Sequence, residues 1–363
     1  MPSEPASADG LEQAAVKRLD LASLRILRLA LGTALSLLFS QLVAWPMSFV
    51  SAVITMFILA LPLPALSLRN GITFMIAFIV AVYAGLIFLP FMLNQRLVGI
   101  LLLGLALYHT FYFTARGGSQ VVGTLATVGL AVVTAIGTVS IDAVLAVSGG
   151  LSVGAIVGVL FVWIAHAALP DSMASPLIAD PPQTPPVVTP DLAEARRSAW
   201  RSLVIVMPVI LWFMLSSASV TNVGFMIKVA SMGQQVRIGE TRQVARSLIA
   251  STVIGGIAAI IAWQALSIYP SLLLYVLLVG LAGLVMGPRI FSGPGIHPSS
   301  ATWSYAYLTM IIILAPAVVD SQVGGSAGAA FWSRLQMFLW ATVYGTGAVF
   351  LFDTLWPRSS KSN

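Results

Sequence analysis

The sequence predicts an all-α polytopic membrane protein with about 12 transmembrane helices, arranged as two parallel six-helix repeats. Hydrophobic residues make up 58% of the 363 residues and charged residues only 8%, whereas soluble domains carry about 25% charged residues. One hydrophilic stretch divides the rest into two apolar stretches of similar length, and several arginines recur at a constant offset. A chain this apolar cannot cover itself with polar surface in water, but lipid solvates it directly.

The hydrophilic stretch, residues 170–197, has a repeated proline pattern between Pro181 and Pro190. Proline lacks an amide proton and disfavours a helical residue before it, so we expect an extended linker here. The predicted units are a cytoplasmic tail (1–21), the first six-helix repeat (22–169), the Pro-rich cytoplasmic linker (170–197), the second repeat (198–357) and a cytoplasmic tail (358–363).

The first repeat is predicted to hold six spans separated by turns and breaks. The first span begins at a basic flank and ends at Trp45-Pro46, where an interfacial aromatic residue precedes a helix stop. A short second run, 48–61, ends at Pro62-Leu63-Pro64. The other runs are 72–93, 97–113, 121–141 and 143–169, and the last carries a seam of small residues, Gly150, Gly154 and Gly158, that favours close helix packing.

The second repeat is predicted at residues 202–219, 220–233, 247–266, 269–286, 301–319 and 331–356. Its second run is short, polar and bounded by glycine, and Lys228 is the one basic residue well inside an apolar run. Short spans at matching places in two halves indicate a transporter site, and charges inside a membrane are usually functional. The alternative is an amphipathic helix at the interface, with Lys228 extending to the lipid headgroups.

The basic residues predict the orientation. With the amino terminus in the cytoplasm and alternating spans, nearly all lysines and arginines fall on the cytoplasmic side, while Arg96 and Arg334 fall outside. This asymmetry is the positive-inside pattern, and it explains the formal charge of +6 without nucleic-acid binding. We therefore expect a multi-pass protein of the bacterial inner membrane with both termini cytoplasmic. Residues 1–20 are polar, which is not typical of a cleavable signal.

Arginines indicate an internal duplication. Arg28 and Arg201 are 173 residues apart, and the same offset separates Arg69 from Arg242 and Arg116 from Arg289. An even number of spans in each half makes the halves parallel, with a pseudo-twofold axis along the membrane normal and a pathway between them.

The predicted substrate-binding residues are basic. Duplicated arginines near the axis would form a cationic vestibule that collects carboxylates, with Lys228 deeper in the pathway. Their alternative role is to anchor the topology at lipid phosphates. The candidates are Arg69, Arg116, Lys228, Arg242 and Arg289.

Four titratable residues are candidates for proton coupling. Asp142 and Asp320 lie at the outer ends of the fifth and eleventh predicted spans. His109 and His297 are candidates because histidine is the residue type suited to carry a proton at physiological pH. Solvated span ends and interfacial histidines are the alternatives. His297 belongs to a glycine-proline segment, 287–300, whose exposed amides before a span would favour an anion; an ordinary loop is the alternative.

Aromatic residues offer a further candidate contact. Trp303, Tyr305 and Tyr307 alternate along a predicted span and would stack an aromatic substrate, unless they only pack or form part of an interfacial belt.

Several function classes are disfavoured. The chain has no cysteine and only three scattered histidines, so no metal site or cofactor is expected. The phosphate-binding pattern GxxxxGK[ST] is absent, so ATP hydrolysis by this chain is not expected. The acidic residues lie at span ends and the histidines are separated, which argues against a membrane enzyme. A major-facilitator transporter normally carries a Gly-x-x-x-Asp-Arg-x-Gly-Arg-type loop after its second span. The corresponding loop here, Leu66–Gly71, lacks the acidic residue and the second basic residue of that pattern.

Two motifs carry a family resemblance. Arg69-Asn70-Gly71 opens a span after a proline-terminated short one, and Glu240–Arg246 precedes a span containing Gly255-Gly256. In these features the chain resembles the fusaric-acid-resistance-type, or aromatic carboxylic acid exporter (FUSC-like), membrane family, over about residues 22–169 and 198–356. It is most similar to a short branch of unknown function that lacks the folded cytoplasmic domain. Plant anion channels with six spans per subunit are also similar.

The resemblance implies an inner-membrane exporter of aromatic or other organic acids. It also implies a periplasmic membrane-fusion adaptor protein and an outer-membrane channel as partners, besides membrane lipid and a small organic anion. We therefore expect a proton-driven secondary transporter in a tripartite efflux system. The alternatives are a passive organic-anion channel and a non-transporting structural subunit of an efflux complex.

Overall fold

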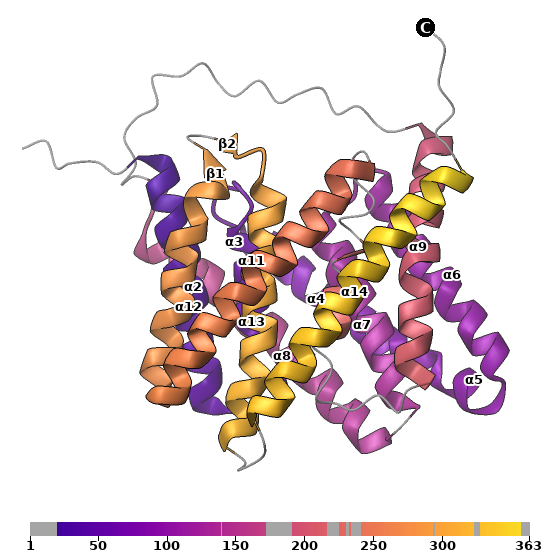
Figure 1. The fold of residues 1–363 in the computed structure, drawn as a ribbon, viewed down its shortest axis with the longest axis horizontal. Coiled ribbons are helices and arrows are strands. Elements are labelled where there is room, and N and C mark those ends of the chain that lie inside the picture. Colours follow the sequence, from indigo (N-terminus) through magenta and orange to yellow (C-terminus); the bar gives the residue numbers. More distant parts are fainter. Residues whose placement is uncertain are drawn as a thin grey trace, which may run out of the picture.

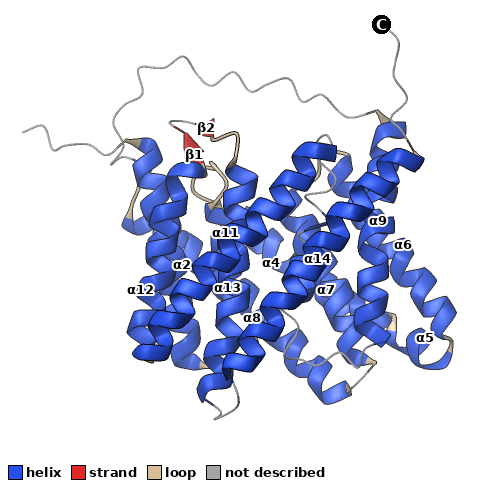
Figure 2. Ribbon diagram, in the orientation of Figure 1, coloured by secondary structure: helices blue, strands red, loops and turns tan. Residues whose placement is uncertain are grey.

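The computed structural model describes residues 20–138, 140–171, 191–215, 225–229, 232–233, 241–292, 295–322 and 327–356. Most of both predicted tails, the proline-rich part of the linker and the start of the short eighth run lie outside these residues. The predicted all-α membrane class is confirmed, because nine helices among the described residues are long and apolar enough to cross a membrane. Figure 2 shows helices throughout and one small hairpin.

The helices follow the predicted runs closely. The first half contains α2 (Leu21–Val43), α3 (Val50–Leu59), α4 (Leu68–Ile87), α5 (Leu89–Asn94), α6 (Arg96–Ala115), α7 (Gln120–Gly137) and α8 (Ile141–Ala168). The second half contains α9 (Leu192–Leu215), helical residues 225–229 and 232–233, α11 (Thr241–Ile268), α12 (Leu272–Met286), η3 (Gly287–Arg289), β1 (Phe291–Ser292), β2 (Gly295–Ile296), α13 (Ser300–Gln322) and α14 (Ala327–Leu355). Since α9 begins at Leu192, the last six residues assigned to the linker are helical.

Local signals in the sequence explain several helix ends. The first helix, α2, ends one residue before Ala44, which adopts a left-handed conformation (φ 56°) just before Trp45-Pro46, as predicted. Ser67 begins α4 by accepting a hydrogen bond from the Asn70 amide, and Ser271 begins α12 in the same way through the Leu274 amide. Such caps satisfy amides that have no partner within the helix.

The helices form one bundle in which the two halves are interleaved. Within the first half, α3 packs against α2 and α8, and α4 packs against α7 and α8. Within the second half, α11 packs against α13 and α14. The most extensive contacts between the halves place α12 beside α2 and α6 beside α9 (Figure 1), and smaller ones join α3 to α13 and α7 to α9. The start of α2, the end of α14 and the hairpin all lie at the same end of the bundle (Figure 1).

The predicted glycine seam is confirmed. A Cβ atom at Gly154 would lie 3.1 Å from Val50, and one at Gly158 would lie 2.9 Å from Ile54, so α8 approaches α3 closely along this seam. The close approach also lets the Thr55 hydroxyl donate a hydrogen bond to the Gly158 carbonyl over 3.1 Å. Small residues therefore set the distance between α3 and α8.

We expect Gly158→Val to destabilise the protein. The added side chain would overlap Ile54 and push α8 from α3, and such overpacking costs about 1–3 kcal/mol. The measurement is the thermal unfolding midpoint of the purified protein in detergent. The matched control is Gly149→Val in the same helix, where a Cβ meets nothing within 4 Å. Equal midpoints for the two variants would contradict this account of the seam.

Candidate functional site

Helix α3 is too short to cross a bilayer. Its ten residues extend about 15 Å, half of a hydrocarbon core of about 30 Å. All ten residues are buried, and the helix is followed by the break at Pro62-Leu63-Pro64. The side chains at the end of the helix, from Ile58 to Ala60, are therefore enclosed by the bundle.

A second short helical segment, residues 225–229, carries Lys228, the one lysine among the described residues. The Lys228 side chain is only 2% exposed, and its Nζ donates a hydrogen bond to Thr309 Oγ1 on α13 over 2.9 Å. Burial of Lys228 contradicts the alternative in which it extends to the lipid headgroups, because neighbouring helices enclose it. Burying an ammonium group is costly, which points to a functional reason for it.

A cavity of about 260 Å³ lies where the two halves meet. The first half contributes the end of α3 and Thr124 near the start of α7, and the second half contributes the segment from β2 into α13. Its polar lining residues are Thr124, His297, Ser300, Ser304 and Tyr305. This cavity was not predicted, because its walls come from three segments that are far apart in the sequence.

A short hydrogen-bond chain connects Lys228 to this cavity. The Thr309 hydroxyl that accepts from Lys228 itself donates to the Tyr305 carbonyl over 2.7 Å. Tyr305 lies one turn before Thr309 on α13, and it lines the cavity. One turn of helix rises about 5.4 Å, so Lys228 contacts α13 about one turn deeper than the cavity does.

The four candidate arginines lie at separate helix ends and are exposed. Arg69 and Arg242 are the second residues of α4 and α11, Arg116 follows α6, and Arg289 belongs to η3 after α12. The Arg289 guanidinium lies over the Trp303 ring, 5.7 Å from its centroid. None of the four takes part in the salt bridges found among the described residues, which belong to Arg28, Arg197 and Arg201.

Of the proton-coupling candidates whose side chains are described, His297 alone lines the cavity. Its Nδ1 lies 2.8 Å from Ser299 Oγ. Asp142 is exposed in the first turn of α8, and His109 is exposed on α6 with its ring against Tyr108. Asp320 belongs to the last turn of α13, but its side chain lies outside the described residues.

The three aromatic residues on α13 do not form a common stacking surface. Tyr307 is fully buried, and its hydroxyl donates to the Val279 carbonyl over 3.0 Å. Tyr305 packs edge-on against Phe57 in the cavity wall, whereas Trp303 lies under Arg289. The hypothesis that all three stack one substrate is therefore wrong, because alternate residues of a helix point in different directions.

Two ion pairs of buried arginines were missed. Arg28 on α2 is 3% exposed; its Nη2 lies 2.6 Å from the Asp171 carboxylate, and its Nε donates to the Leu169 carbonyl. Arg201 on α9 is 2% exposed and pairs with Asp353 on α14, which Arg197 also contacts at 3.1 Å. In each half an arginine of the first helix thus holds an aspartate at the end of the last helix. The recurrence of Arg28 and Arg201 at the 173-residue offset was the sequence signal that could have indicated these ion pairs.

Comparison with known proteins gives one match. Residues 25–165, from α2 to the last turn of α8, match a family described as "Protein of unknown function (DUF2955)". The match covers less than half of the chain, and the description gives no activity. No curated protein and no solved structure matches the sequence.

Proposed function

We propose that this protein is an internally duplicated, twelve-helix secondary transporter that exports organic anions across a bacterial inner membrane and is driven by the proton gradient. The observation that carries the proposal is the buried Lys228 ammonium, hydrogen-bonded to α13 one turn from a cavity lined by both halves. A cation held inside a membrane protein beside a cavity is suited to bind an anion in transit.

The packing supports duplication. With the 173-residue offset, α2, α4 and α6 correspond to α9, α11 and α12, and α3 corresponds to the short segment at 225–229. Corresponding helices have corresponding partners: α4 packs on α7 and α8, and α11 packs on α13 and α14. The contact between α2 and α12 corresponds to the contact between α9 and α6, because α2 corresponds to α9 and α12 to α6. A twofold relation requires such a correspondence.

The proposed route begins at the end of the bundle where the first helix starts and the last one ends, which we assign to the cytoplasm (Figure 1). Exposed arginines at helix ends would raise the local concentration of carboxylates there. The anion would then enter the cavity and reach Lys228. His297, in the cavity wall, is our first candidate for the coupled proton, ahead of Asp142, Asp320 and His109.

The proposal extends to the protein's family and partner proteins. We propose that the protein belongs to the FUSC-like exporters of aromatic or other organic acids, as its motifs suggest. It would then deliver its substrate to a periplasmic membrane-fusion adaptor and an outer-membrane channel.

The proposal is tested by flux of a panel of hydroxybenzoates from proteoliposomes, with and without an imposed proton gradient. Flux that requires the gradient, and is absent from protein-free liposomes, supports the proton-driven exporter. Flux that follows only the electrochemical gradient of the anion would replace it with a passive channel. If the protein gives no flux either alone or together with the adaptor, the proposal of transport is overturned and a structural subunit is favoured.

We expect Arg242→Gln to slow flux at low salt but not at high salt. An exposed arginine acts over a distance, and screening shortens that distance from about 30 Å at 0.01 M to about 3 Å at 1 M ionic strength. The measurement is the initial rate at both salt concentrations. Arg96→Gln is the control, because Arg96 is also exposed but begins α6, at the opposite helix end from Arg116. An equal loss at both salt concentrations would contradict electrostatic attraction.

A further inference from the structure

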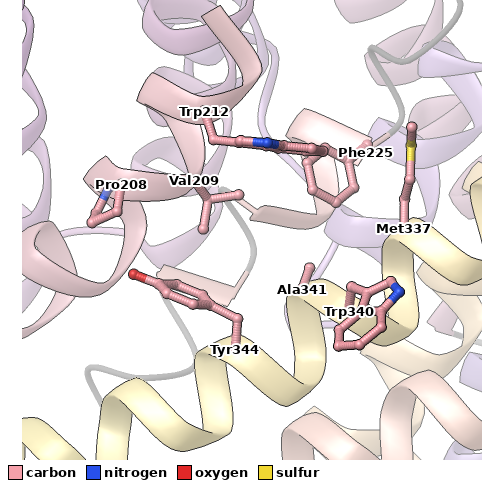
Figure 3. Close-up of a pocket in the computed structure, with 8 residues that line it drawn as sticks. All are labelled: Pro208, Val209, Trp212, Phe225, Met337, Trp340, Ala341 and Tyr344. Atoms are coloured by element: carbon pink, nitrogen blue, oxygen red, sulfur yellow. The ribbon is translucent and has the colours of Figure 1, made fainter. Parts of the chain in front are cut away.

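A second cavity, of about 380 Å³, lies between α9, the short segment 225–229 and α14. Figure 3 shows aromatic rings from all three elements around it. Its lining residues are Pro208, Val209, Trp212, Phe225, Met337, Trp340, Ala341 and Tyr344. The Tyr344 hydroxyl and the two indole N–H groups are the polar side-chain groups of this lining, so the cavity wall is almost entirely hydrocarbon and aromatic.

The cavity lies beside the middle of α14, on an exposed face of the bundle. Ala341 is the central residue of α14, so about 21 Å of helix extends from it in each direction. On the rim, Trp340 is 73% exposed and Trp212 is 52% exposed. In a helix that crosses a hydrocarbon core of about 30 Å, this position faces the middle of the bilayer, where lipid tails end.

Neither water nor a void is a favourable occupant. Water needs two to four polar partners in a cavity, and this lining offers few. A void would deprive the aromatic walls of dispersion contacts. We propose that the cavity binds the acyl chain of a bilayer phospholipid, inserted laterally between α9 and α14.

The matching place in the first half is occupied by a pair of aromatic rings. Phe39 on α2, at the position corresponding to Trp212, packs against Phe161 of α8 with ring centroids 5.6 Å apart. At this position the α2–α8 seam therefore holds a pair of the protein's own aromatic rings, whereas Trp212 lines a cavity between α9 and α14. The opening is therefore a property of these particular residues rather than of helix packing in general.

An acyl chain here would support the segment that carries Lys228. Phe225 lines the cavity and packs against Phe213 of α9 and Phe338 of α14. It precedes Lys228 by less than one helical turn. Phospholipid bound at this site would therefore stabilise the 225–229 segment between its neighbours, whether or not the protein transports anions.

The test uses the full chain in bilayer nanodiscs that contain a phospholipid with a diazirine either at the end of one acyl chain or close to its headgroup. After irradiation, cross-linked peptides are mapped by mass spectrometry. We expect the chain-end probe to label residues 208–212 and 337–344 more strongly than 97–105 of α6, although Leu97 and Leu101 are more exposed than Trp212. Uniform labelling of exposed helices, or preferential labelling by the headgroup-proximal probe, would overturn the proposal.

Variants that fill the cavity with a larger side chain provide a second test. Ala341→Phe places a ring in the cavity and should reduce labelling of 208–212 severalfold; Met337→Phe should act in the same direction. The control is Val343→Phe, because Val343 is exposed on the same helix but does not line the cavity. Unchanged labelling in a folded filling variant would overturn the proposal, as would cross-links between protein chains in place of lipid adducts. If neither filling variant folds, the comparison of the two probes on the unmodified chain decides.

Discussion

Replacing Lys228 with methionine should lower organic-anion flux by about tenfold to a hundredfold. A hydrogen bond to a charged group contributes about 1.5–3 kcal/mol, and each 1.4 kcal/mol corresponds to a factor of ten. Methionine keeps the length and apolar stem of the side chain but removes the charge that would bind a carboxylate. Flux from proteoliposomes containing equal amounts of protein measures the effect.

The control for this variant is Met226→Leu, a volume-conserving change at a fully buried position of the same short helical segment. It should keep nearly full flux. Thermal unfolding of both variants separates a lost site from a lost fold. If the Lys228→Met protein is folded and transports normally, Lys228 is not the anion site, and the proposed pathway loses the observation that carries it.

Replacing Asp353 with alanine should cost about 3–5 kcal/mol of stability, because it leaves the Arg201 guanidinium buried without its carboxylate. The expected result is a large fall in the midpoint of thermal unfolding. The measurement is the tryptophan fluorescence of the protein in detergent as the temperature rises. Asp142→Ala should leave the midpoint unchanged, since Asp142 is exposed.

A double variant distinguishes a lost contact from an unpaired charge. In Arg201→Met/Asp353→Leu both charges are replaced by apolar groups, and such replacements of buried ion pairs are often neutral or stabilising. We expect it to recover most of the stability lost in Asp353→Ala. A double variant as unstable as the single one would mean that the pair contributes through its geometry, for instance by orienting Arg197 on Asp353.

The sequence was informative where structure depends on neighbouring residues. Apolar runs predicted the helices because lipid requires long apolar segments with internal hydrogen bonds. Trp45-Pro46 predicted the end of α2, and the glycines of α8 predicted its close packing, because these are local steric properties. The break after α3 was predicted for the same reason.

The arrangement of the site depends on contacts that no local pattern encodes. Arg28 near the start of a span was interpreted as a flank, since its carboxylate partner, Asp171, lies at the other end of the first half. The cavity wall joins Phe57, Thr124 and His297, which belong to three segments far apart in the chain. Lys228, singled out because apolar residues surround it in the sequence, is also buried in the structure.

The crossed packing of α6 on α9 and of α12 on α2 affects how the molecule can move. If one side of the bundle rocks against the other, each moving body must carry a helix encoded in the other half. α12 would travel with α2, and α6 with α9. The mechanical units are then not the two sequence repeats but two mixed bodies, hinged through the connections on either side of α6 and α12. Cross-linking α12 to α2 would join helices within one body and leave the motion free, whereas a cross-link between α3 and α13, which come from different bodies, would block it.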